Sequence, residues 1–70
     1  MYYHMGDVVR ELRHQKGWTQ EQLADFAGVK RKCVMSIELT GLGRITSLER
    51  ILGVMGYELE AVPTNVREMT

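Results

Sequence analysis

The sequence of 70 residues contains one cysteine and one proline, and it has no excess of charge of either sign. The single cysteine, Cys33, excludes an intrachain disulfide, and with His4 and His14 it lacks the spacing of a zinc site. No apolar run approaches the roughly 18 residues of a transmembrane helix, and the N-terminus lacks the basic-then-apolar pattern of a secretory signal. We therefore expect a cytoplasmic chain that needs no metal and no other cofactor.

The length and composition are those of one small globular domain. A chain of this size buries only about 60% of the surface that it exposes when unfolded, and its 44% hydrophobic and 26% charged residues are close to globular averages. We predict a single domain over residues 1–63 and a mobile polar tail over residues 64–70. Because nine Lys and Arg residues balance nine Asp and Glu residues, a nucleic acid would have to be bound by a local basic patch.

Apolar residues recur with the period of an α-helix in four segments. The helices are expected from about Asp7 to Lys16, from Thr19 to Gly28, from Arg31 to Leu39 and from Thr46 to Gly56. The second and fourth begin with a threonine followed three residues later by Gln22 or Glu49, which predicts a capping box at each. The residues predicted to face the core are Met5, Val9, Leu12, Leu23, Ala24, Ala27, Val34, Ile37, Leu48, Ile51, Leu52 and Met55. Leu39 and Leu42 of the glycine-containing loop are expected to fold back on this core.

A change of period follows the fourth helix. Tyr57, Leu59 and Ala61 share one face of an alternating pattern that Pro63 ends, which is typical of a short β-strand. A lone strand would leave its N–H and C=O groups unpaired, so its partner is either residues 2–3 of the same chain or the equivalent strand of a second copy. The predicted fold is all-α, with four helices and a short C-terminal β-strand.

Two of the predicted helices are short and are joined by a tight turn at Gly28, and the second begins with three cations, Lys30, Arg31 and Lys32. Cations oppose the helix dipole at this end of a helix, so their presence favours a functional role. Helix-turn-helix proteins place such a helix in the major groove of DNA. The pattern therefore predicts a DNA-binding surface.

The chain resembles the phage-repressor (XRE-like) helix-turn-helix family over roughly residues 5–56. The resemblance rests on Gly17-Trp18-Thr19-Gln20, Leu23-Ala24, Ala27-Gly28-Val29, Val34, Ile37-Glu38 and Ser47-Leu48. It implies that Arg31, Lys32 and Ser36 read bases and that Gln20 contacts a phosphate. Lys30, Arg44 and the helix N-termini at Thr19 and Thr46 are expected to contact further phosphates.

Arg13 and Glu38 each follow a predicted core residue by four positions, so they lie at the margins of the apolar stripes of the first and third helices. Two isolated charges would be costly there, and we expect the two side chains to form a buried ion pair. The family resemblance implies the same pair.

The sequence thus predicts a DNA-binding repressor that recognises an inverted repeat as a homodimer, with Tyr57, Leu59 and Ala61 at the contact between copies. The C-terminal strand also resembles that of small antitoxins that repress their own operons, which implies a kinase-type toxin as a partner. The alternative is a protein-interaction module in which DNA contact is secondary. No pattern of nucleophile and base is present, so the sequence does not indicate an enzyme.

Overall fold

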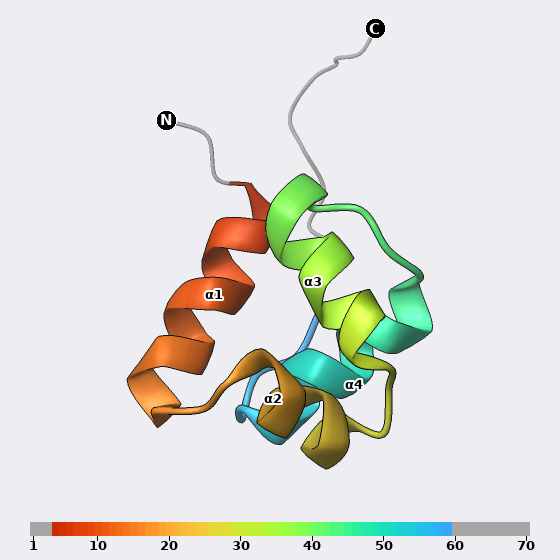
Figure 1. Ribbon diagram of the computed structural model, residues 1–70. Coiled ribbons are helices and arrows are strands. Elements are labelled where there is room, and N and C mark those ends of the chain that lie inside the picture. Colours follow the sequence, from red (N-terminus) through yellow and green to blue (C-terminus); the bar gives the residue numbers. More distant parts are fainter. Residues whose placement is uncertain (1–3, 60–70) are drawn as a thin grey trace, which may run out of the picture.

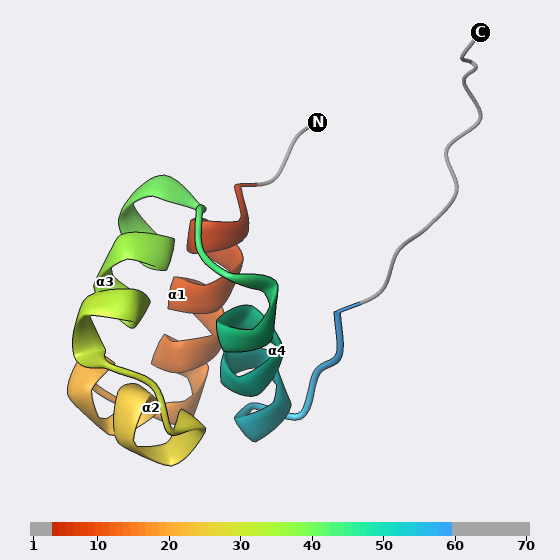
Figure 2. The same ribbon diagram turned by 90° about the vertical axis from the view of Figure 1, so that its right-hand side faces the viewer.

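The computed structural model describes residues 4–59, which form four helices joined by short connections (Figure 1). The helices are α1 (Met5–Lys16), α2 (Gln20–Ala27), α3 (Arg31–Thr40) and α4 (Ile45–Val54). Helix α3 packs against both α1 and α2, and α2 also packs against α4. Figure 2 shows α3 and α4 at opposite edges of the helical body. The four predicted helices are confirmed, and within residues 4–59 none is long and apolar enough to cross a membrane.

The turn between α2 and α3 has the glycine that the sequence predicts. Gly28 ends α2 with a φ of 71°, in the left-handed region that favours glycine. The N–H groups of Gly28 and Val29 donate to the carbonyl oxygens of Asp25 and Ala24 at 3.3 and 3.0 Å. These bonds give the last carbonyl groups of α2 their hydrogen-bond partners within the turn itself. The local geometry of the turn therefore sets the direction in which α3 begins.

The two predicted capping boxes have different outcomes. At α2, the Thr19 hydroxyl accepts from the Gln22 N–H at 3.0 Å and the Gln22 side chain accepts from the Thr19 N–H at 2.9 Å, which confirms the first box. The box at Thr46 is wrong, because α4 begins one residue earlier, with Arg44 at the N-cap and no side-chain cap. Thr46 therefore lies inside the first turn of α4.

Helix α1 begins at Met5, two residues before the predicted start. The His4 side chain caps it, with Nδ1 accepting from the Gly6 N–H at 3.1 Å. Gly6 also lies directly against the C-terminal half of α3, where a Cβ at this position would come within 2.6 Å of the Glu38 carbonyl oxygen. The absence of a side chain at Gly6 is thus what lets α1 and α3 approach each other.

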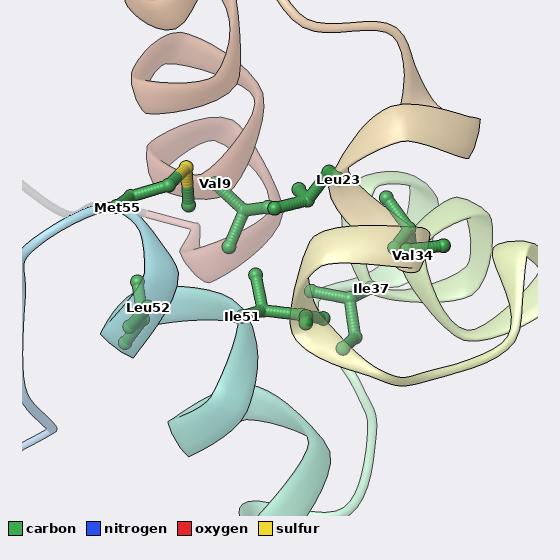
Figure 3. Close-up of a cluster of buried hydrophobic side chains, with 9 residues drawn as sticks. Val9, Leu23, Val34, Ile37, Ile51, Leu52 and Met55 are labelled. Carbon is green, nitrogen blue, oxygen red and sulfur yellow. The ribbon is translucent and has the colours of Figure 1, made fainter.

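The core lies between the four helices and consists largely of the predicted residues (Figure 3). Its buried members are Val9, Leu23, Ala24, Ala27, Val34, Ile37, Ile51, Leu52 and Met55, with Met5, Leu12, Trp18 and Leu48 half-buried around them. The expectation for Leu39 and Leu42 is wrong, since they are 79% and 72% exposed. Helix α3 continues to Thr40, and its inward face is made by Val34, Ile37 and Glu38, so Leu39 points away from the core.

The described part of the predicted C-terminal strand, residues 57–59, is not in a strand. The Tyr57 N–H donates to the Leu52 carbonyl oxygen at 2.9 Å and so closes the end of α4 instead of joining a ladder. Leu59 is half-buried against the core. The rest of the predicted strand with Ala61, its possible partner at residues 2–3 and the predicted tail at residues 64–70 lie outside the described residues. Over residues 4–59 the fold is all-α.

Candidate nucleic-acid interface

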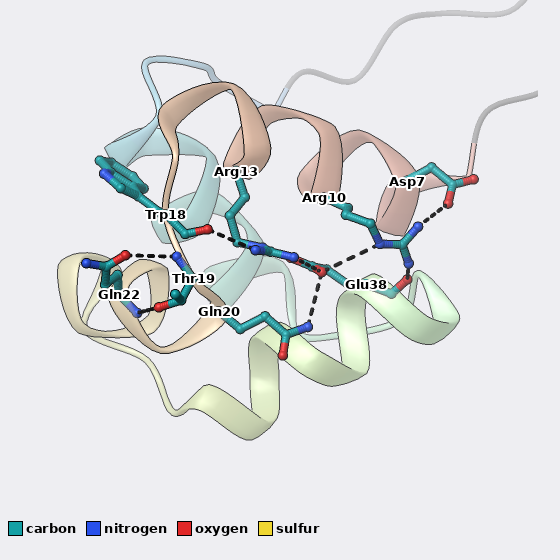
Figure 4. A network of polar contacts seen from close by, with 8 residues as sticks. All are labelled: Asp7, Arg10, Arg13, Trp18, Thr19, Gln20, Gln22 and Glu38. Atoms are coloured by element: carbon teal, nitrogen blue, oxygen red, sulfur yellow. Dashed lines mark hydrogen bonds and ion pairs between the residues drawn. The ribbon is translucent and has the colours of Figure 1, made fainter.

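The expected ion pair between α1 and α3 is present (Figure 4). Arg13 Nε lies 2.6 Å from Glu38 Oε2, and Arg13 Nη2 donates to Glu38 Oε1 at 2.9 Å, so the contact is bidentate. The Glu38 side chain is 3% exposed and that of Arg13 is 11% exposed. Arg13 also donates to the Trp18 carbonyl oxygen at 2.9 Å, which ties the connection between α1 and α2 to the pair.

Glu38 also accepts hydrogen bonds from two further side chains, and neither bond was predicted. Gln20, the first residue of α2, donates from Nε2 to Glu38 Oε1 at 3.1 Å. Arg10 lies with its Nε 3.7 Å from the same oxygen, donates to the Glu38 carbonyl oxygen at 2.8 Å and pairs with Asp7 at 3.1 Å. The spacing of Arg10, one helical turn before Arg13, is the signal in the sequence that could have identified it.

The pKa values of the pair show that both groups are held in their charged forms. Burial raises the pKa of the Glu38 carboxyl, but the hydrogen bonds from Arg13 and Gln20 and the charges of Arg13 and Arg10 outweigh it and leave the pKa below its ordinary value of 4.5. The hydrogen bond to Glu38 raises the pKa of Arg13 against the opposing effect of burial. Arg13, Glu38 and the side chains bonded to them therefore form a fixed polar network.

The structure brings most of the predicted contact residues onto one surface around α3. Thr19, Gln20 and Arg31 line one shallow depression. Gln20, Lys32 and Ser36 line a second, and Lys32, Ser36 and Arg44 line a third. Lys30 and Thr46 are exposed but line none of the three. Gln20, Lys32 and Ser36 each line two of these depressions. The three depressions are therefore continuous across the outward face of α3.

The N-termini of α3 and α4 differ from those of the other two helices. Lys30 and Arg44 are their N-cap residues, neither helix has a side-chain cap, and neither has an acidic residue in its first turn. Helices α1 and α2 each have both a side-chain cap and an acidic residue there. The free N–H groups and the positive end of the helix dipole make the first turns of α3 and α4 suited to an anion such as a phosphate.

Comparison with known proteins gives a consistent result. No family model matches the chain. The N-terminal DNA-binding domain of SinR from Bacillus subtilis superposes with a TM-score of 0.71 and 32% identity, covering 80% of this chain and 86% of that domain. A solved complex of the SinR and SinI proteins matches with a TM-score of 0.70 and 30% identity, covering 77% of this chain and 54% of that one.

A curated relative, the competence pilus inhibition repressor of Acinetobacter baylyi, is 44% identical over 34 residues, which are 49% of this chain and 31% of that protein. The match thus spans about a third of the length of that repressor. The SinR DNA-binding domain is matched over 86% of its length by this chain, in which α2 and α3 form the helix-turn-helix. The chain therefore belongs to the phage-repressor-like (XRE) family of helix-turn-helix DNA-binding domains, which are not enzymes.

Proposed function

We propose that this protein is a sequence-specific DNA-binding transcriptional repressor. The observation that carries the proposal is the continuous surface around α3, on which Arg31, Lys32 and Ser36 are exposed between Gln20 on one side and Arg44 on the other. An exposed helix flanked by cations and helix N-termini fits the major groove between two phosphate backbones. The name of the matched relative, a repressor, supports the direction of regulation.

The residues of this surface divide into two roles. Arg31, Lys32 and Ser36 are exposed on α3 and would reach base edges in the major groove. The remaining residues lie around them at helix starts and would contact phosphates, which orient the protein without specifying a sequence. These phosphate contacts are Thr19, Gln20, Lys30, Arg44 and Thr46.

A homodimer is the second part of the proposal. One helix-turn-helix domain contacts one half-site, whereas two copies related by a two-fold axis would contact an inverted repeat. The segment with Tyr57, Leu59 and Ala61 follows α4 directly, and Tyr57 is 53% exposed at its start. We propose that this segment holds two copies together.

Selection of binding sites from a pool of random DNA duplexes tests the proposal directly. The expected result is enrichment of an inverted repeat, and binding of this repeat should weaken steeply with rising salt as counterion release becomes less favourable. Enrichment of no sequence would overturn the proposal. Placing the enriched repeat before a reporter gene then tests repression, and increased transcription would contradict that part.

A protein-interaction module is the alternative function. Leu39, Leu42 and Ile45 are 79%, 72% and 66% exposed beside the candidate interface, which favours a contact with another protein. The matched SinR protein has been solved as a complex with the SinI protein. A partner bound through such apolar residues would be held with little dependence on salt, which separates this alternative from DNA binding.

The antitoxin role stays a prediction that rests on the family resemblance alone. Its test is the co-expression of this chain with a kinase-type toxin encoded beside its gene. Rescue of growth would support the role, and unrelieved toxicity would contradict it.

A further inference from the structure

The hydrogen bond between Gln20 and Glu38 joins the buried ion pair to the surface proposed to bind DNA (Figure 4). Glu38 is buried, with 3% of its surface exposed, whereas Gln20 is half-buried at the first position of α2 and lines two of the surface depressions. A single side chain thus reaches from a fixed internal charge to the surface.

The chemistry of Glu38 determines which end of the Gln20 amide faces inward. An ionised carboxylate only accepts hydrogen bonds, so the NH2 group of Gln20 must point toward it. One of the two N–H groups is used at 3.1 Å from Oε1, and the other remains as a donor. Glu38 itself is held by Arg13 from two nitrogen atoms, so it gives Gln20 a fixed anchor.

We propose that Glu38 is a positioning residue for DNA binding, which acts by holding the Gln20 amide with its second N–H group available to a backbone phosphate. This inference rests on the proposed contact between Gln20 and DNA. A free glutamine side chain loses conformational entropy when a ligand orders it. The bond to Glu38 removes part of this loss before DNA arrives, so the ion pair contributes to affinity as well as to stability.

The first test measures the order of the Gln20 side chain in the free protein. Gln15 is the matched control, because it lies on the exposed face of α1 with its Nε2 3.5 Å from Glu11. In ¹⁵N relaxation experiments, the side-chain amide of Gln20 should be as ordered as the backbone of α2, and that of Gln15 should be mobile. Equal mobility of the two amides would overturn the inference.

The second test removes the anchor without leaving a buried charge. In the double variant R13M/E38M, apolar side chains of similar length replace both partners, a change that proteins often tolerate without loss of stability. Circular dichroism verifies the fold. This variant should bind the selected duplex about two- to tenfold more weakly than the natural protein, because binding must then order the unanchored Gln20 side chain. Gln20→Ala should then weaken binding less in R13M/E38M than it does in the natural protein, because the anchored side chain contributes more to binding.

A control variant separates positioning from stability. Ile51→Val trims a fully buried side chain of α4 and leaves Gln20, Arg13 and Glu38 in place, so it should lower stability and leave DNA affinity unchanged. If R13M/E38M is folded and binds like the natural protein, Glu38 has only a structural role and the inference is wrong. If the natural protein itself selects no duplex, the proposed function is wrong. The two results therefore distinguish a failure of the inference from a failure of the proposed function.

Discussion

Glu38 illustrates at the scale of single residues how a buried charge is tolerated in a core this small. Its two carboxylate oxygens accept from Arg13 and Gln20, and Arg10 adds a second positive charge nearby. A buried ion pair adds little stability over a well-packed apolar pair, but removal of one partner leaves the other charge uncompensated. The consequence of substitution therefore depends on whether one partner or both are changed.

Glu38→Ala should lower the free energy of unfolding by about 3–5 kcal/mol, because it leaves the guanidinium of Arg13 buried without its partner. Urea denaturation followed by circular dichroism measures the change. Glu49→Ala, which removes an exposed carboxylate from α4, is the control and should change stability by less than about 0.5 kcal/mol. A loss of less than about 1 kcal/mol for Glu38→Ala would be that of an exposed pair and would contradict the prediction.

Stability should fall at acid pH in a way that depends on this pair. The pKa of Glu38 is lower in the folded protein than its ordinary value of 4.5, so below that value the unfolded chain binds more protons than the folded one. The contribution of the pair is complete above pH 4.5 and is lost as the pH falls through the folded pKa. Denaturation at a series of pH values should show a steeper acid decline for the natural protein than for R13M/E38M. Identical pH profiles would contradict this.

The sequence predicts the pairing of Arg13 with Glu38 because helical periodicity places both at the edges of apolar stripes. It does not predict the bonds of Gln20 and Arg10 to Glu38. Those depend on how far each side chain reaches across the contacts between α1, α2 and α3, which a one-dimensional pattern does not contain. The same holds for His4, whose ring nitrogen caps α1 in place of the usual hydroxyl or carboxylate.

At the scale of helices, local signals are reliable where neighbouring elements do not interfere. The box at Thr19 forms as predicted, whereas the similar pattern at Thr46 does not. The loop before α4 passes tightly over α3, since a Cβ at Gly43 would lie 2.6 Å from Ile37 Cγ1. This contact directs the chain into α4 at Arg44, and a tertiary constraint thus prevails over a local preference of about 1 kcal/mol.

Two helical glycines should respond to alanine in opposite ways. At Gly6 in α1, the new Cβ would meet the backbone of Ile37 and Glu38, so Gly6→Ala should push α1 and α3 apart and lower stability by about 1–3 kcal/mol. At Gly53 in α4, no atom outside the local helix lies within 4 Å of the new Cβ, so Gly53→Ala should raise stability by about 0.5–1 kcal/mol. Thermal denaturation measures both changes. Equal signs for the two variants would contradict the packing described for α1.

At the scale of the whole molecule, the division of the DNA surface into two roles leads to distinct changes of specificity. Lys32→Ala should alter the bases preferred in site selection, because one base contact discriminates by about 1–3 kcal/mol. Arg44→Ala should weaken binding to all sequences alike and reduce the dependence on salt. If selection with the Lys32 variant returns an unchanged motif, Lys32 contacts a phosphate and the assignment of roles is wrong.

The four helices do not by themselves specify how two copies of the protein assemble. Recognition helices must lie about 34 Å apart to enter successive major grooves, so the element that joins two copies sets which operators can be bound. A chain ended after Leu59 keeps all described residues, including the packing of Leu59 on the core, but lacks Ala61. It should sediment as a monomer and bind the selected inverted repeat at least about 100-fold more weakly, because the avidity of two linked sites is lost.

A chain ended after Pro63 is the matched control and should remain dimeric with full affinity, since it loses only residues 64–70. Sedimentation equilibrium of the two chains, with circular dichroism to show that both are folded, measures the difference. A dimer of the shorter chain with unchanged operator affinity would exclude residues 60–63 from assembly and assign the contact to residues 1–59.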